Sequence, residues 1–224
     1  MFWRIVPVIH PKRVPCALLV LALAACQAGN PLLNSERIER KFGSYGVEVL
    51  ATAGNRRVTS LYSGSGNEKT MRTYAVVEFP GPARPEYRKE HDAIVGGESI
   101  GSTFERAGWE IRKQSTFMGE LDVPASYELI GQLMGIDLPA TLAVHEYLFI
   151  IERDERSFHY AKIVELHHPA YLDAAELEAL YGVIVLDDSN RDRIHDFIGP
   201  PAGNEWQVPV SPMGLGVELK NRFE

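Results

Sequence analysis

The chain has 224 residues, with 23 Lys and Arg against 30 Asp and Glu and a formal net charge of −7 at pH 7. An acidic chain without a basic stripe or zinc-finger spacing lacks the positive field that displaces counterions from phosphates, which excludes nucleic acid as the expected partner. Its length suits one domain of ordinary size, or one domain plus an extension.

The N-terminal residues have the order of a secretory signal. Three basic residues, Arg4, Lys12 and Arg13, precede an apolar run at 14–25, and small residues close the run before a cysteine. Twelve apolar residues are too few to span a bilayer. This order of residues predicts export of the protein. The alternatives are an ordinary secretory signal with an incidental cysteine and a buried N-terminal helix.

The last residues of that run, Leu23-Ala24-Ala25-Cys26, resemble the lipobox of bacterial lipoproteins. The resemblance implies cleavage before Cys26, which would carry a thioether-linked diacylglycerol and an amide-linked fatty acyl chain such as palmitate. Stable attachment to a membrane takes more than one acyl chain, and three chains satisfy that requirement. Gln27, where an aspartate would resemble the inner-membrane retention signal, favours the periplasmic face of the outer membrane.

The chain has two cysteines, Cys16 in the predicted signal and Cys26 at the predicted anchor. The mature protein is therefore expected to contain no disulfide and to be held by its core, although small exported domains often depend on disulfides. Its 20 basic and 30 acidic residues give the mature chain a formal net charge of −10. The lipid anchor, and not surface charge, is then expected to hold the protein to the bilayer.

The rest of the chain reads as alternating helices and hairpins. Asn34 or Ser35 is expected to cap the first helix, because their side-chain oxygens can accept from free amides of the first turn. The expected helices lie at 36–42, 86–95, 100–106, 125–134, 172–180 and 191–197. The expected strands lie at 47–50, 57–62, 73–79, 109–118, 142–151, 158–166 and 183–186. Turns are expected at Gly54-Asn55 and at Asp154-Glu155.

Consecutive hairpins dominate this order and no strand-helix-strand alternation runs through it, so we expect an α+β fold with a mainly antiparallel sheet and flanking helices. The expected divisions are a signal peptide at 1–25, a lipid-anchored tether at 26–34, a globular domain at 35–198, and a tail rich in proline and glycine at 199–224.

The residue types best suited to catalysis or binding lie at the end of the second long strand, at residues 163–169. Side chains alternate along a strand, which predicts one face with His159, Ile163, Glu165 and His167, and the other with Tyr160, Lys162, Val164 and His168. A three-residue hairpin loop would place His145 opposite Glu165, whereas a two-residue loop would place Val144 there.

Two kinds of chemistry fit that strand end. Two histidines and a glutamate could converge on zinc, although their spacing is not a known ligand motif. Alternatively, Glu165 could act as a general acid in an apolar pocket. The chain has no G-x-S-x-G elbow, P-loop, dinucleotide-binding glycine fingerprint or H-E-x-x-H. No cofactor or metal is therefore expected.

Three stretches together resemble the fold shared by chorismate lyase and the effector-binding UTRA domain of GntR-type regulators. They are residues 99–112, the helix ending at Gly135, and the hairpin through 165–170. The resemblance implies a catalytic role for Glu165 in the lyase case. It also implies an arginine that grips substrate carboxylates, for which Arg57 and Arg72 are the nearest candidates. The expected ligand-binding residues are Arg57, Arg72, His145 and His167.

The leading functional hypothesis is a non-catalytic envelope lipoprotein. Its domain would bind a small anionic or aromatic ligand or dock against another envelope protein. The alternative is a lyase-like enzyme that uses Glu165 as general acid on a small carboxylate. A third hypothesis is a purely structural interaction protein that makes contacts through its C-terminal tail.

Overall fold

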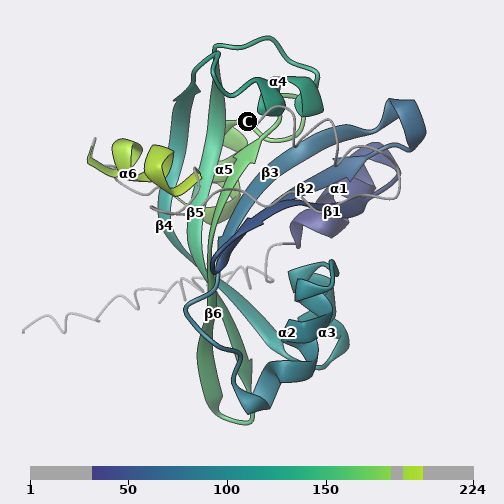
Figure 1. Cartoon of the computed structure of the whole chain (residues 1–224), viewed down its shortest axis with the longest axis vertical. Coiled ribbons are helices and arrows are strands. Elements are labelled where there is room, and N and C mark those ends of the chain that lie inside the picture. The colour runs from purple at the N-terminus through teal and green to yellow at the C-terminus, as the bar shows by residue number, and fades with distance from the viewer. Residues whose placement is uncertain (1–31, 183–188, 199–224) are drawn as a thin grey trace, which may run out of the picture.

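The computed structural model describes residues 32–182 and 189–198. Its centre is a six-stranded antiparallel sheet with the strand order β1-β2-β3-β6-β5-β4 and helices packed around it (Figure 1). The predicted α+β class is confirmed. Within the described residues, no helix combines the length and the apolar character needed to cross a membrane.

Each expected helix and strand inside the described residues is present, most with shifted ends. The strands are β1 (Gly46–Ala53), β2 (Arg56–Ser63), β3 (Thr70–Glu78), β4 (Glu110–Val123), β5 (Ala140–Arg153) and β6 (Arg156–His167). The helices are α1 (Asn34–Phe42), α2 (Arg88–Val95), α3 (Ile100–Arg106), α4 (Glu128–Met134), α5 (Ala174–Tyr181) and α6 (Ser189–Ile198). Two short 3₁₀ turns, η1 (Gly66–Glu68) and η2 (Pro85–Tyr87), complete the order.

The start of the first helix differs from the expectation. Leu33 occupies the capping position, and its N–H donates to the Glu36 carboxylate at 2.9 Å. The prediction that Asn34 or Ser35 caps the helix was therefore wrong by one or two residues. Both side chains are buried within the first turn, which frees Asn34 for a different contact described below.

The fold consists of two three-stranded meanders. The first, β1-β2-β3, follows α1, and the second, β4-β5-β6, follows α2 and α3. Strands β3 and β6 join the two meanders antiparallel in the middle of the sheet. Figure 1 shows α2 and α3 together at the lower end of the sheet and α1 beside β1 and β2 above them.

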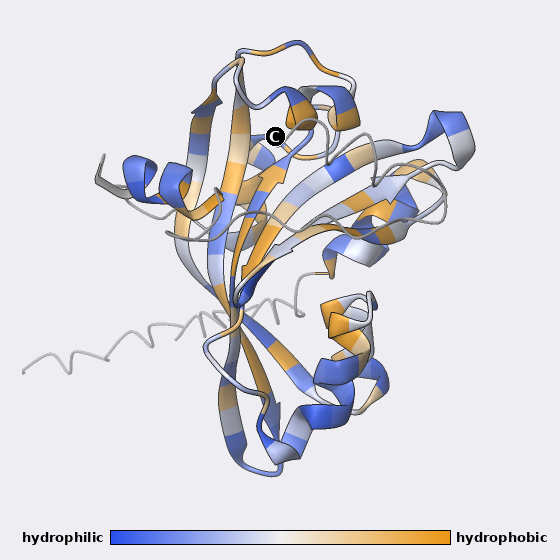
Figure 2. Cartoon of the chain, in the orientation of Figure 1, coloured by the Kyte–Doolittle hydropathy of each residue, from blue (hydrophilic) through white to orange (hydrophobic). Residues whose placement is uncertain are grey.

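Figure 2 shows apolar residues along the length of the strands. Neighbouring residues of the central strands, such as Ile163 and Val164, are both buried and point to opposite faces, so each face of the sheet is covered by its own core. One face packs against α4 and α6 through residues such as Val164 and Leu166. The other carries an aromatic core under α2 and α3, and a smaller core under α1 and α5. Glu165 lies on this second face, between the two cores.

The β5–β6 hairpin decides between the two predicted pairings of Glu165, with His145 or with Val144. Its turn has two residues, Asp154 and Glu155, but Tyr160 is an unpaired bulge residue that shifts the register. Above the bulge His145 therefore pairs with Glu165. The bulge also turns Tyr160 into the core with Phe149 and Ile163 and leaves His159 exposed. The predicted faces of Tyr160 and His159 were wrong, because a bulge breaks the two-residue period of a strand.

Several predictions lie outside the described residues. They are the signal peptide and Cys26, the tether up to residue 31, the strand at 183–186, and the tail at 199–224.

Candidate functional site

A cavity of about 60 Å³ lies between the central strands and the first residues of α1 and α3. Its walls are largely apolar and include Ala75, Val77, Ile100, Phe149 and Ile163. Polar side chains line the same space, among them Asn34, Arg57, Thr59, Lys113 and Glu165. An apolar pocket with a few converging polar groups is the usual form of a small-molecule site.

Cross-strand pairing brings Thr59 and Glu165 into the cavity together. Thr59 pairs with Ala75, and Ala75 pairs with Glu165, so all three side chains lie in one row on the same face. The Glu165 carboxylate is only 4% exposed, and the Tyr147 hydroxyl donates to it at 3.0 Å. Burial, followed by the nearby Glu165 charge, raises the pKa of Tyr147 well above its usual value. Tyr147 therefore stays protonated and is a permanent donor to Glu165.

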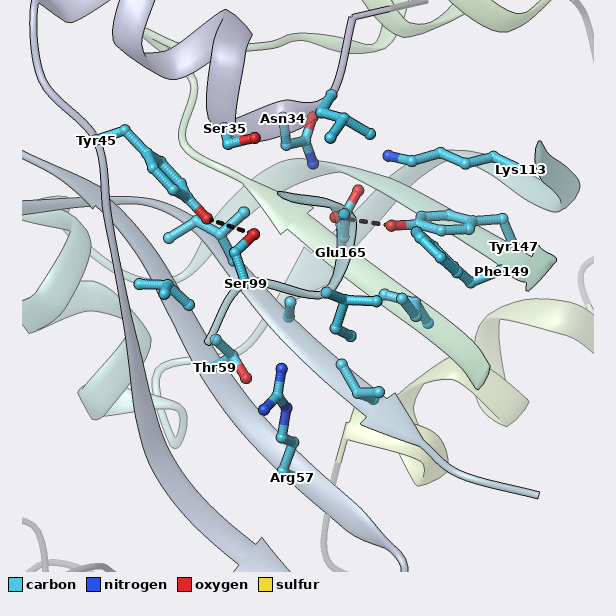
Figure 3. Close-up of a pocket in the computed structure, with 18 residues that line it drawn as sticks. Asn34, Ser35, Tyr45, Arg57, Thr59, Ser99, Lys113, Tyr147, Phe149 and Glu165 are labelled. Atoms are coloured by element: carbon cyan, nitrogen blue, oxygen red, sulfur yellow. Dashed lines mark hydrogen bonds between the residues drawn. The ribbon is translucent and has the colours of Figure 1, made fainter. Parts of the chain in front are cut away.

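Arg57 lies in the next row of the same face, which contains Val77 and Ile163. Two residues along a strand and two strand spacings separate the Cα atoms of Arg57 and Glu165 by about 12 Å. Arg57 and Asn34 lie at opposite ends of the close-up, with Glu165 between them in this view (Figure 3). A small molecule placed between Arg57 and Glu165 would meet an arginine at one end and a carboxylate at the other.

The Arg57 side chain is a buried cation with an unfilled donor. It is 4% exposed; one Nη donates to the Ile94 carbonyl at the end of α2, and Nε has no partner among residues 32–182 and 189–198. Burial lowers the pKa of Arg57 to about 10, so the group remains charged at neutral pH. Among the described residues, no carboxylate lies within ion-pair distance of it.

Asn34 is the cavity residue that the sequence analysis missed as a ligand contact. Its Oδ1 accepts from the Tyr171 hydroxyl at 3.0 Å and from Arg37 Nη1 at 3.3 Å. These two donors orient the amide, and Nδ2 is left buried without a partner in the wall of the cavity. The Thr59 hydroxyl is also buried and unpartnered. No sequence signal identified Asn34, because its role depends on Tyr171, 137 positions later.

Lys113 on β4 was missed for the same reason. Its ammonium group lies 4.5 Å from the centre of the Tyr147 ring, a cation–π contact at the edge of the cavity. The two cations Arg57 and Lys113 and the single carboxylate Glu165 leave the cavity with an excess of positive charge.

The two predicted histidines lie behind the cavity and not on its wall. His167 Nε2 is 3.9 Å from the Glu165 carboxylate, and His167 Nδ1 contacts the Thr73 hydroxyl at 3.1 Å. Burial lowers the pKa of His167 to about 4, and it lowers the pKa of His145 well below its usual value. Both rings are therefore neutral at pH 7. His145 contacts Ser115 at 2.8 Å and stacks against Tyr147 and Tyr181.

Arg72 lies away from the cavity. Its Nε donates to the Ser63 hydroxyl at 2.8 Å, and its guanidinium group lies 3.9 Å from the centre of the Phe42 ring. Of the two predicted arginines, the structure thus brings only Arg57 together with Glu165.

A metal site has no support in this part of the chain. Across residues 32–182 and 189–198, no three His, Cys, Asp or Glu side chains are grouped so that they could hold a metal ion. The two histidines and the glutamate at the end of β6 therefore do not form a zinc site in the described residues.

Comparison of the chain with models of known protein families gave no match, and comparison with curated proteins gave none.

Proposed function

We propose that the protein is an envelope lipoprotein, anchored through Cys26, whose α+β domain binds a small carboxylate ligand in the cavity between Arg57 and Glu165. The observation that carries this proposal is the Arg57 Nε donor, which is buried and unpartnered and belongs to a side chain lining an apolar-walled cavity.

A carboxylate is the ligand group that best satisfies the Arg57 end of the cavity. Leaving a buried polar group without a partner costs about 1–3 kcal/mol, and more for a charged group. A carboxylate can accept from the guanidinium group and from the Thr59 hydroxyl at once, and arginine binds carboxylates through planar paired hydrogen bonds.

The Glu165 end favours a different group. Glu165 can accept a hydrogen bond, while the Asn34 amide can only donate one through Nδ2. A hydroxyl both donates and accepts, whereas a second carboxylate would be repelled by Glu165. The two ends and the apolar walls together describe a small hydroxy-carboxylate with a hydrocarbon or aromatic body.

The N-terminal sequence supports the anchored location. The short apolar run, the basic residues before it, and the small residues before Cys26 belong together in a lipoprotein signal. Gln27 favours the periplasmic face of the outer membrane as the destination.

Binding is favoured over protein docking by the described surface. Its exposed large apolar side chains are Val95 at the end of α2 and Leu180 on α5, which lie on separate elements. Single apolar residues are ordinary on a protein surface, whereas docking sites are contiguous apolar patches.

Titration calorimetry with benzoate and 4-hydroxybenzoate tests the proposal, with the neutral benzamide as a matched ligand control. We expect the carboxylates to bind the wild-type protein at least tenfold more tightly than benzamide, and Arg57→Gln to remove that preference. Arg112→Gln, an exposed arginine paired with Glu152, should leave binding unchanged. Equal affinity for benzamide and benzoate in the wild-type protein would overturn the carboxylate assignment without any variant.

A second candidate function is a lyase-like enzyme with Glu165 as general acid. The buried position of Glu165 beside Tyr147, in a cavity that also contains Arg57, favours it. The order of a short helix, a strand, a helix and a late hairpin supports the resemblance to chorismate lyase and the UTRA domain. Turnover of a small carboxylate by the wild-type protein, lost in Glu165→Gln, would favour this candidate over simple binding.

A further inference from the structure

Leu33 seals one side of the cavity. Its side chain lines the cavity, is 8% exposed, and packs against the start of α3 at Gly101. A Cβ atom at position 101 would lie 2.6 Å from Leu33 Cδ1, closer than real Cβ contacts come. The leucine therefore occupies space that is open only because residue 101 is glycine.

The contacts that hold Leu33 differ on its two sides. On the α1 side, its N–H donates to Glu36, and the neighbouring Leu32 carbonyl accepts from Arg37 at 2.8 Å. On the α3 side, the leucine side chain has only van der Waals contact, because it carries no hydrogen-bonding group. Just before α3, the Tyr45 hydroxyl donates a hydrogen bond to the Ser99 hydroxyl at 3.2 Å (Figure 3).

Three polar side chains of the cavity are buried. Asn34, Arg57 and Glu165 are each 5% exposed or less, and Asn34 Nδ2 and Arg57 Nε are out of contact with water, so a ligand that binds these atoms must displace part of the wall. Leu33 is a wall residue that can leave α3 without breaking a side-chain hydrogen bond.

We propose that Leu33 is the plug of the cavity, and that ligand exchange requires this residue to move away from Gly101. This inference rests on the proposed function and adds a residue that controls ligand exchange. Six residues lie between Cys26 and Leu33, and seven Cα–Cα steps set a maximum reach of about 25 Å between the predicted anchor and the plug.

A reversible disulfide across the contact tests this directly. A Cβ at position 101 would lie 3.4 Å from Leu33 Cγ, the position that a cysteine sulfur at 33 would occupy, so a disulfide is within reach. The experiment uses Leu33→Cys with Gly101→Cys in the chain from residue 26 with Cys26→Ser, which has no other thiol. We expect benzoate association, followed by stopped-flow mixing, to slow at least tenfold in the oxidised protein and to recover on reduction. The single-cysteine variants should show no effect of oxidant.

A measurement without ligand separates this proposal from the previous one. Hydrogen exchange of the Arg37 amide, which donates the first helical hydrogen bond of α1 to the Leu33 carbonyl at 3.0 Å, reports opening of the wall. Leu33→Ala and Gly101→Ala should each raise that exchange at least fivefold, and Leu180→Ala on the surface should not.

The outcomes distinguish the two proposals. Faster exchange without any benzoate binding would keep the plug and reject the carboxylate ligand. Unchanged exchange in Leu33→Ala and Gly101→Ala, or equal association rates in the oxidised and reduced double-cysteine protein, would overturn the plug.

Discussion

His145 lies directly opposite Glu165 in the β5–β6 ladder, although the two-residue turn of this hairpin by itself would pair Glu165 with Val144. The Tyr160 bulge supplies the one-residue shift. A one-residue slip moves every side chain of a strand to the other face, so this bulge decides that Glu165 faces the cavity once the turn is in place.

A substitution in the β5–β6 turn is expected to stabilise the protein. Asp154 and Glu155 both have positive φ, 51° and 63°, a conformation that side chains other than glycine and asparagine disfavour. Glu155→Gly is expected to stabilise the protein by about 0.5–1 kcal/mol, since the left-handed conformation costs other residues about 1–2 kcal/mol and glycine loses part of that gain in chain entropy. Urea unfolding measures the change. Glu155→Ala, which keeps the strain, is the control, and an equal gain there would contradict the explanation.

Acid should weaken the fold through its buried histidines. Burial lowers the pKa of His167 to about 4, whereas the unfolded chain takes up this proton near pH 6.5. Stability from the neutral ring is therefore complete above pH 6.5 and is lost as the pH falls toward 4, by about 3 kcal/mol for a shift of this size. His145 contributes in the same direction.

Urea unfolding between pH 7 and pH 4 measures this slope. His167→Gln should reduce the slope, and His159→Gln at an exposed site should not. A slope that is equal in both variants would assign the acid sensitivity to other groups.

The opposite face of the sheet depends on a buried carboxylate. Glu146, with a side chain 1% exposed, receives hydrogen bonds from Arg193 at 2.7 Å and Thr116 at 2.8 Å and an ion pair from Lys162 at 2.8 Å. Burial by itself raises the pKa of Glu146, but these partners outweigh burial and lower the pKa to about 2.

Arg193→Gln should therefore cost about 1–2 kcal/mol, because Arg193 is partly exposed and Lys162 still pairs with Glu146. Arg191→Gln, an exposed arginine on the same helix, is the matched control. The wild-type contribution of Glu146 is present above its unfolded pKa of about 4.3 and is lost as the pH falls toward 2. Equal unfolding midpoints for the two arginine variants would argue against the buried pair.

Glu165→Gln separates a binder from an enzyme. The amide keeps the shape of the side chain but cannot supply an acidic proton, so a general acid is lost while most contacts remain. For a binder we expect the affinity for 4-hydroxybenzoate to change less than tenfold. For an enzyme we expect turnover to fall by at least a hundredfold with a smaller change in KM. Calorimetry and product analysis on the same preparation give both values.

Cys26→Ser should release the protein from the membrane. The wild-type chain, purified from membranes, is expected to begin at Cys26 and to carry the mass of a diacylglycerol and an acyl chain. Intact-mass spectrometry checks both points. A polypeptide of unmodified mass that retains residues 1–25 would reject the lipoprotein assignment.

Local patterns were enough to predict the fold class and the approximate place of each element. Strand alternation, glycine and proline punctuation, and the Asp154-Glu155 turn all act over a few residues, so the sequence carries them directly. The α+β class, the hairpins and the shared face of Glu165 and His167 could be predicted for this reason. The predicted lipoprotein signal is equally local, because it is a contiguous sequence pattern.

The composition of the cavity was decided only by tertiary structure. Arg57 reaches it through the pairing of β2 with β3 and β3 with β6, and Asn34 is oriented by Tyr171 from the far end of the domain. The Tyr160 bulge and the Leu33 contact with Gly101 likewise depend on residues distant in sequence. A cross-strand neighbour is set by register and a wall contact by packing. Both are properties of the assembled sheet and helices, so no window of the sequence contains them.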